Sequence, residues 1–144
     1  MVLARFHEQL RGEGRQWRDL NPVSAGELIG RIAAEVAEDF QGGLMNASAE
    51  SRFRTVALTQ GLQRFMAVQI GWMARYRFDP AEVELGFGVD GASLPAWEIG
   101  LGGGRRLAFR GRSDRVDLFR VEDGRARVVV CDDRAGGTGL RLWS

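Results

Sequence analysis

The spacing of apolar residues changes at Pro80, and this change constrains the fold more than any other feature of the sequence. Before Pro80, apolar side chains recur every three or four residues, as they do along one face of a helix. After Pro80, they alternate with polar residues, which is the period of a β-strand with one buried face. A helical part followed by short strands predicts an α+β fold, in which N-terminal helices precede an antiparallel β-meander.

Three helices are expected before Pro80. They are predicted over residues 2–10, from the Asn21-Pro22 turn to residue 40, and over residues 49–77. Ser48 has the side chain of an N-cap residue, and we expect the third helix to begin after it. The apolar stripes of these helices are expected to form core rather than a cofactor-binding surface.

Five strands are expected after Pro80, over residues 82–89, 96–101, 105–112, 114–121 and 125–132. At 144 residues the chain is long enough for one domain with a modest core. We expect a single partial domain, with a helical part over residues 1–79, a β-meander that carries an acidic site over residues 80–134, and a truncated tail over residues 135–144.

The cysteine content and the hydropathy point to a cytoplasmic protein. Cys131 is the single cysteine, which excludes an internal disulfide and a cysteine-rich metal site. No apolar run approaches the length of a transmembrane helix, and the N-terminus lacks a signal-peptide pattern. We therefore expect a reducing compartment and no membrane partner.

All the basic residues of the chain are arginines, because it contains no lysine. From Arg105 to Arg141, ten arginines accompany six acidic residues, an excess of four positive charges. The planar guanidinium suits contacts with phosphate, so the stretch is a hint of nucleic-acid binding. A genome-wide codon bias against lysine is the other explanation, and both stay open.

Two acidic residues stand at the ends of neighbouring strand candidates, Asp114 at the start of one and Asp132 at the end of the next. If residues 122–124 form the connection, with Gly124 left-handed, Asp114 lies opposite Asp132; a two-residue turn would place it opposite Asp133 instead. Facing carboxylates repel one another unless a cation neutralises them. A divalent ion such as Mg²⁺ is one explanation of this pair, and solvated strand ends are the other.

Four stretches carry a resemblance to a known family: WRDL at residues 17–20, VELGFG at 83–88, LPAWEIGLGGGRRLAFRGRSDRVDLF at 94–119 and VVVCDDRAGG at 128–137. They resemble the C-terminal nuclease domain of the AddB-type subunit of AddAB helicase–nucleases, a member of the PD-(D/E)XK nuclease superfamily. The resemblance covers nearly the whole chain. It implies a partial α/β core of the restriction-endonuclease type and a role in processing double-strand DNA breaks.

The resemblance implies roles for three acidic residues. Asp114 falls on a metal-binding aspartate of the family, and Asp132 on the aspartate of its DYK block. Glu84 falls on a further acidic position, which either approaches the metal or is an exposed strand residue. The implied cofactor is Mg²⁺, the implied reaction is metal-assisted hydrolysis of DNA, and the implied partner is an AddA-type helicase–nuclease subunit.

The chain departs from the family pattern at three places. The lysine of the DYK block is replaced by Arg134, which can stabilise charge on a phosphate but stays protonated and cannot transfer a proton. A family histidine ahead of the first helix has no counterpart, and His7 is expected at the surface instead. The cysteines that follow the DYK block are also missing, so no iron–sulphur cluster is implied in this chain.

Two functions therefore stay open for the chain. One is a metal-dependent DNA nuclease domain, in which Asp114, Asp132 and Arg134 act at the site. The other is a catalytically inactive, truncated remnant that binds DNA or a partner protein through its arginine-rich sheet. Because helices are predicted only ahead of the strands, we expect one sheet face to be poorly covered and the protein to self-associate.

Overall fold

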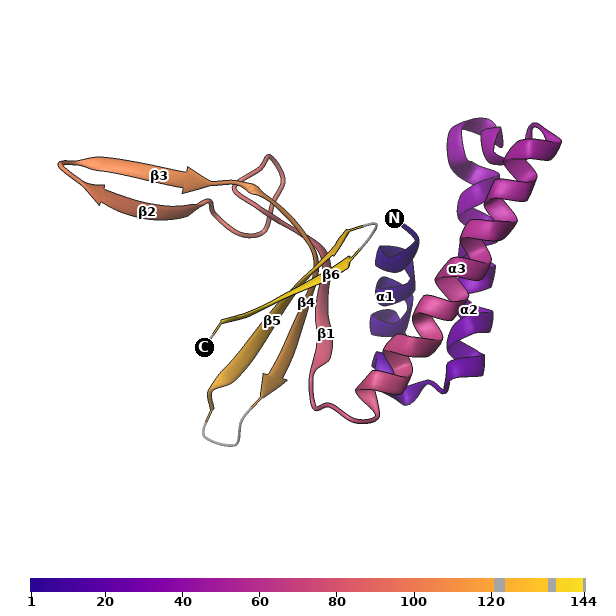
Figure 1. Ribbon diagram of the computed structural model, residues 1–144, viewed down its shortest axis with the longest axis horizontal. Coiled ribbons are helices and arrows are strands. Elements are labelled where there is room, and N and C mark those ends of the chain that lie inside the picture. Colours follow the sequence, from indigo (N-terminus) through magenta and orange to yellow (C-terminus); the bar gives the residue numbers. More distant parts are fainter. Residues whose placement is uncertain (121–123, 135–136, 144) are drawn as a thin grey trace. The chain divides into compact units, whose positions relative to one another are not determined.

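The computed structural model describes the backbone of residues 1–120, 124–134 and 137–143 and, within these ranges, the side chains up to Cys131. Helices are followed by antiparallel sheets, which confirms the α+β fold class (Figure 1). The chain forms two compact units, Met1–Asp79 and Pro80–Ser144. Within the described residues, no helix combines the length and the apolar character that crossing a membrane requires.

Three helices make up the first unit: α1 (Val2–Gly12), α2 (Pro22–Asp39) and α3 (Ala49–Met73). The starts of α2 and α3 agree with the prediction, because each has a side-chain cap. Asn21 accepts a hydrogen bond from the backbone N–H of Ser24 at 2.9 Å, and the Ser48 hydroxyl accepts one from the N–H of Ser51 at 3.0 Å. These bonds satisfy donors that the first helical turn leaves unpaired.

The helices α2 and α3 lie side by side (Figure 1), and they approach closely at Gly30. A Cβ atom at this position would lie 2.6 Å from Nε2 of Gln63, which donates a hydrogen bond to the carbonyl oxygen of Gly26 at 3.1 Å. Because Gly30 has no side chain, Gln63 of α3 can come close enough to form a hydrogen bond with the backbone of α2.

Trp17 is at the centre of the core of this unit, with 1% of its surface exposed. Phe6 of α1 meets its ring edge-on, with the ring centroids 5.2 Å apart. The indole Nε1 donates a hydrogen bond to Nδ1 of His7 at 3.2 Å. His7 is buried, so the prediction of a surface histidine is wrong. The reason is that a buried indole N–H needs an acceptor, which His7 supplies from α1.

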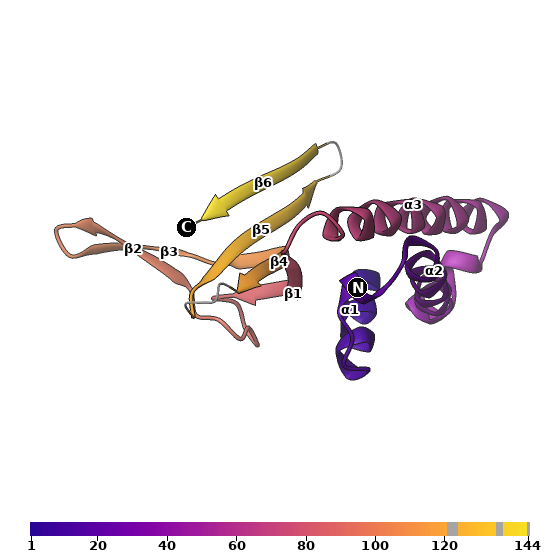
Figure 2. The same cartoon turned by 90° about the horizontal axis from the view of Figure 1, so that it is seen from below.

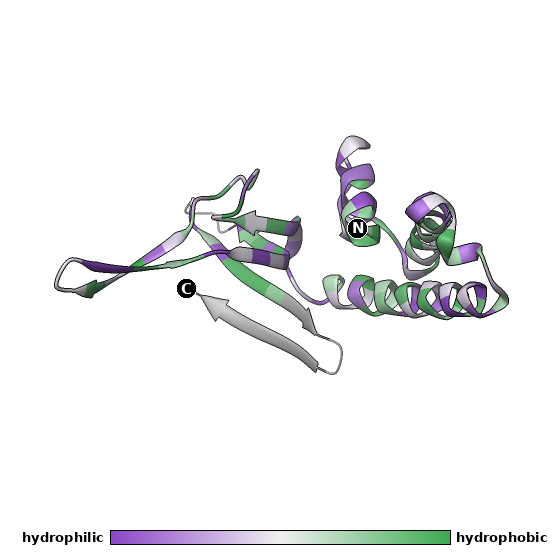
Figure 3. Cartoon of the chain, turned by 90° about the horizontal axis from the view of Figure 1, so that it is seen from above, coloured by the Kyte–Doolittle hydropathy of each residue, from purple (hydrophilic) through white to green (hydrophobic). Residues whose placement is uncertain are grey.

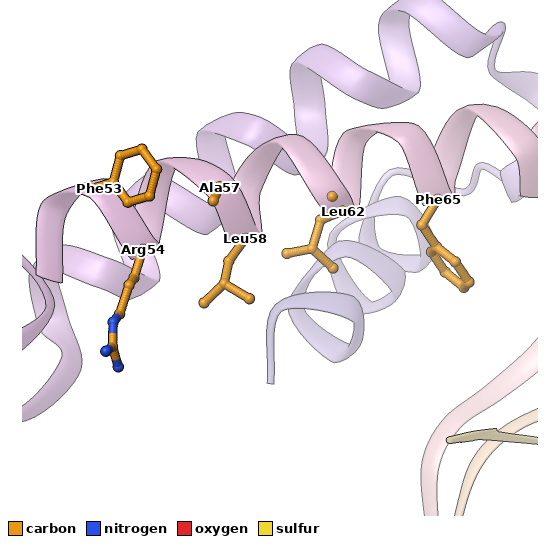
Figure 4. Close-up of a pocket in the computed structure, with 7 residues that line it drawn as sticks. Phe53, Arg54, Ala57, Leu58, Leu62 and Phe65 are labelled. Atoms are coloured by element: carbon orange, nitrogen blue, oxygen red, sulfur yellow. The ribbon is translucent and has the colours of Figure 1, made fainter. Parts of the chain in front are cut away.

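The helix α3 is buried in its C-terminal part only. Met66 is fully buried, whereas Phe53 is 74% exposed. Apolar residues are distributed along the whole helix (Figure 3), and those between Phe53 and Phe65 line an open surface of α3 (Figure 4). The expectation that the apolar stripe of this helix is core is therefore wrong for its first half. The helix also ends at Met73, four residues before the predicted end.

In the described part of the chain from Asp79 onward there are six strands, all within the second unit except for the first residue of β1: β1 (Asp79–Phe87), β2 (Trp97–Gly102), β3 (Arg105–Phe109), β4 (Gly111–Arg120), β5 (Ala126–Arg134) and β6 (Gly137–Trp143). The strands β1, β4, β5 and β6 lie in one sheet in that order, and β2 pairs with β3 in a second sheet (Figure 2). The strand β6 lies within residues 135–144, for which the sequence analysis named a truncated tail and no strand. It pairs with the edge of β5, whose N–H and C=O groups would otherwise need other partners.

The register between β4 and β5 is the one that a three-residue connection predicts. Arg115 pairs with Cys131, Val116 with Val130, and Arg120 with Ala126. A two-residue turn would have shifted every one of these pairs by one residue, so this alternative is excluded. Residues 121–123 lie outside the described part of the chain, but Gly124 has the expected left-handed conformation, with φ of 81°.

Candidate functional site

The β4–β5 pair has two faces of different character, because side chains alternate along each strand and cross-strand partners share a face. One face is buried and carries Arg115, Asp117, Val129 and Cys131. The other face is half-buried and carries Val116, Leu118, Val128 and Val130. Asp114 belongs to the half-buried face by this alternation, so the thickness of the sheet separates it from the buried face.

A polar cluster lies within the buried face. Nε of Arg115 donates a hydrogen bond to Oδ1 of Asp117 at 2.8 Å, and Nη2 donates to Sγ of Cys131 at 3.4 Å. Each of the three residues is less than 9% exposed. The cluster links β4 to β5 at the Arg115–Cys131 pair, next to Asp114. It therefore stabilises the hairpin from the face opposite to Asp114.

The charges within this cluster compensate the cost of its burial. Burial alone disfavours the guanidinium and would lower the pKa of Arg115. The charge of Asp117, the attraction of Cys131 and the hydrogen bonds to both outweigh burial, so the pKa of Arg115 is raised above its usual value. The sequence-based prediction did not include this cluster. The alternation could have revealed it, since positions 115, 117 and 131 share one face in the predicted register.

Asp114 is half-buried and precedes Arg115 on β4. On the partner strand, Asp132 follows Cys131, the residue that pairs with Arg115. When the observed register is extended by one residue, the backbone positions of Asp114 and Asp132 come opposite each other. The side chains of Asp132 and Arg134 lie outside the described ones, while their backbones pair with Gly139 and Gly137 of β6.

Glu84 lies on β1, the neighbour of β4 on the other side. Its φ of 56° is left-handed, a conformation that costs a side-chain-bearing residue about 1–3 kcal/mol. Its Oε2 atom lies 3.8 Å from Nη1 of Arg112 on β4. Strained backbone conformations are concentrated at functional sites. The left-handed backbone of Glu84 therefore supports its choice as a candidate site residue.

The candidate ligands fit Mg²⁺ by their chemistry. Among the described side chains, no group of three His, Cys, Asp or Glu residues is gathered in a way that could hold a metal ion. Asp114, Asp132 and Glu84 come from three neighbouring strands and offer only carboxylate oxygens, the donors that Mg²⁺ prefers. One or two carboxylates are enough for Mg²⁺, because it retains waters and binds phosphate oxygens.

Comparison with known proteins shows similarity to one kind of protein along almost the whole chain, although no family model matches it. Three similar proteins are each named as the B subunit of an ATP-dependent helicase/deoxyribonuclease. They come from Symbiobacterium thermophilum (32% identical), Acetivibrio thermocellus (33%) and Moorella thermoacetica (34%). Each match covers 98% of this chain and 12% of the relative. Over nearly its whole length, this chain is thus homologous to a segment of the B subunits of ATP-dependent helicase/deoxyribonucleases, and it spans about an eighth of their length.

Proposed function

We propose that this chain is a Mg²⁺-dependent deoxyribonuclease domain of the PD-(D/E)XK type, with its metal site on the β4–β5 hairpin. The observation that carries the proposal is the register, in which Arg115 pairs with Cys131. This register is the one of the two considered that would bring Asp114 and Asp132 together on one face. Two such carboxylates are unfavourable neighbours without a cation, and a divalent ion removes their repulsion.

Asp114 and Asp132 would hold the ion, and Glu84 on the adjacent strand is the third candidate ligand. A bound Mg²⁺ supplies positive charge that polarises a phosphodiester and makes a neighbouring water more acidic. Arg134, two residues beyond Asp132, would donate hydrogen bonds to the charged phosphate. Because a guanidinium stays protonated at physiological pH, an arginine cannot take the proton of the attacking water, and we expect slower hydrolysis than with lysine at this position.

The names of the relatives support a role in DNA metabolism, since each is called part of a helicase/deoxyribonuclease. We therefore propose DNA as the substrate and an AddA-type helicase–nuclease subunit as the partner. The process would be the resection of double-strand breaks. The helicase activity in the relatives' name has no counterpart in this proposal, which concerns the hairpin carboxylates only.

The proposal is tested by incubating the purified chain with labelled single-stranded DNA and Mg²⁺. We expect slow cleavage that EDTA stops and that Asp114→Ala and Asp132→Ala each abolish. Arg134→Lys should preserve or raise the rate. Asp133→Ala is the matched control, because it removes a carboxylate from the neighbouring position of β5 and should leave cleavage intact. Cleavage that survives Asp132→Ala would show that the activity arises elsewhere.

A further inference from the structure

The β2–β3 hairpin has one apolar face that is open to solvent. Its pairs are antiparallel, and all residues of both strands are exposed. The cross-strand pairs Trp97 with Phe109 and Ile99 with Leu107 alternate with polar and small residues. These four apolar side chains therefore share one face of the hairpin, which a folded protein rarely leaves in water without a use.

Two aromatic rings form the end of this face. The ring centroids of Trp97 and Phe109 are 5.7 Å apart and their planes are inclined by 39°. Trp97 is 52% exposed and Phe109 is 41% exposed, so ring surface remains accessible after the two rings have packed together. Exposed aromatic faces of this kind are the surfaces on which unpaired nucleic-acid bases stack.

The charge of the hairpin complements a polyanion. The hairpin itself, residues 97–109, contains two arginines and one acidic residue, an excess of one positive charge, and Arg110 follows it directly. The acidic residue, Glu98, lies on the opposite face, where its carboxylate is 3.2 Å from Nη1 of Arg106. Arg105 has the same strand parity as Leu107 and Phe109 and is exposed, so it stands at the far end of the apolar face.

We propose that the β2–β3 hairpin binds single-stranded nucleic acid, with bases on the Trp97–Phe109 platform and phosphates at Arg105. Stacking requires bases with open faces, which a duplex does not offer, and this favours a single strand over a double helix. The net positive charge favours a polyphosphate over an apolar protein surface. Binding at the hairpin requires no metal ion and is separate from the carboxylates of β4 and β5.

The affinity of the whole chain for a fluorescent thymidine oligonucleotide, measured by anisotropy in EDTA, tests the proposal. Trp97→Ala and Phe109→Ala should each weaken binding about tenfold, whereas Trp97→Phe should retain most of the affinity. Arg105→Ala should reduce the dependence of log affinity on log salt by about 0.7, the value for one phosphate contact with a single strand. Phe53→Ala and Trp72→Ala are matched controls, because they remove exposed aromatic rings from α3, and should leave the affinity unchanged.

A measurement on the unaltered protein covers the case in which a variant does not fold. Photocrosslinking of a 5-bromodeoxyuridine oligonucleotide, followed by mass spectrometry, should find crosslinks at Trp97 or Phe109. The proposal is overturned if the crosslinks fall elsewhere, or if folded Trp97→Ala and Phe109→Ala proteins bind like the wild type. It is also overturned if a duplex of equal length or poly-L-glutamate competes as well as the single strand. Loss of cleavage in Asp114→Ala with unchanged binding would leave the two sites distinct, as proposed.

Discussion

Glu84 and the Arg115–Asp117 pair show how single residues bear on the candidate site from different sides. Glu84 holds a left-handed backbone on β1, next to β4. Arg115 and Asp117 form an ion pair whose side chains are each 10% exposed, on the buried face behind Asp114. Glu84 is thus a candidate ligand at a strained position. The Arg115–Asp117 pair stabilises β4, the strand that carries the candidate ligand Asp114.

Replacing Glu84 should separate stability from metal binding. Glu84→Gly removes the side chain and relieves the left-handed strain, so it should be about 1 kcal/mol more stable than Glu84→Ala, which keeps the strain. Both variants lose the carboxylate and should bind Mg²⁺ equally weakly. Urea denaturation and calorimetric titration measure the two quantities. Equal stability of the two variants would show that the φ of 56° stores no strain.

Breaking the buried ion pair should destabilise the protein strongly. Arg115→Ala leaves the carboxylate of Asp117 buried without its guanidinium, a change that typically costs about 3–5 kcal/mol. Since a domain of this kind is stable by only about 5–15 kcal/mol, the midpoint of urea denaturation should fall markedly. Arg112→Ala is the matched control, because its side chain is 63% exposed, and it should change the free energy of unfolding by less than about 0.5 kcal/mol. A loss in Arg115→Ala as small as that of the control would contradict the role of the pair.

At the scale of elements, the sequence predicted what local chemistry determines. The starts of α2 and α3 followed from Asn21 and Ser48, because a cap depends only on residues three positions away. The sequence left two β4–β5 registers open, and the structure has the one that corresponds to a three-residue connection. The pairing of β6 with β5 was missed, because it depends on an open strand edge rather than on local pattern. The Asp114–Asp132 site followed from spacing and resemblance and stays a prediction.

The two halves of α3 should differ in their contribution to stability. Phe53→Ser, at a site that is 74% exposed, should change the free energy of unfolding by less than about 0.5 kcal/mol. Met66→Ala, in the fully buried half, should cost about 2–5 kcal/mol because it leaves a cavity. Denaturation of both variants measures the difference. A cost for Phe53→Ser as large as that for Met66→Ala would show that the first half of α3 is covered in solution.

At the scale of the whole molecule, large apolar side chains are exposed in both units. Phe53 and Leu58 of α3 and Trp97 and Leu101 of β2 each have more than half of their surface in water. Each such side chain forgoes about 1.5–3 kcal/mol of burial, which is a large fraction of the net stability of a domain. We therefore expect the isolated chain to be marginally stable and to self-associate. The sequence predicted this only for the sheet, because the spacing on α3 resembles that of a core helix.

Sedimentation velocity combined with a thermal melt tests this expectation. The chain should sediment as a mixture that shifts to larger species with concentration, and it should melt at low temperature. Phe53→Ser and Leu58→Gln together should reduce the association if α3 takes part in it. A compact monomer that melts cooperatively above about 60 °C, the upper range of mesophilic domains, would show that the exposed surfaces need no cover.

The most direct measurement of the metal site is calorimetric titration of the whole chain with Mg²⁺ and, in parallel, with Mn²⁺. One ion should bind per chain, and Asp114→Asn and Asp132→Asn should each reduce the affinity at least about tenfold, because one of the few ligands is lost. Asp133→Asn should bind as the wild type does, since Asp133 is not among the proposed ligands. Unchanged binding in Asp114→Asn or in Asp132→Asn, or an equal loss in Asp133→Asn, would contradict the shared site.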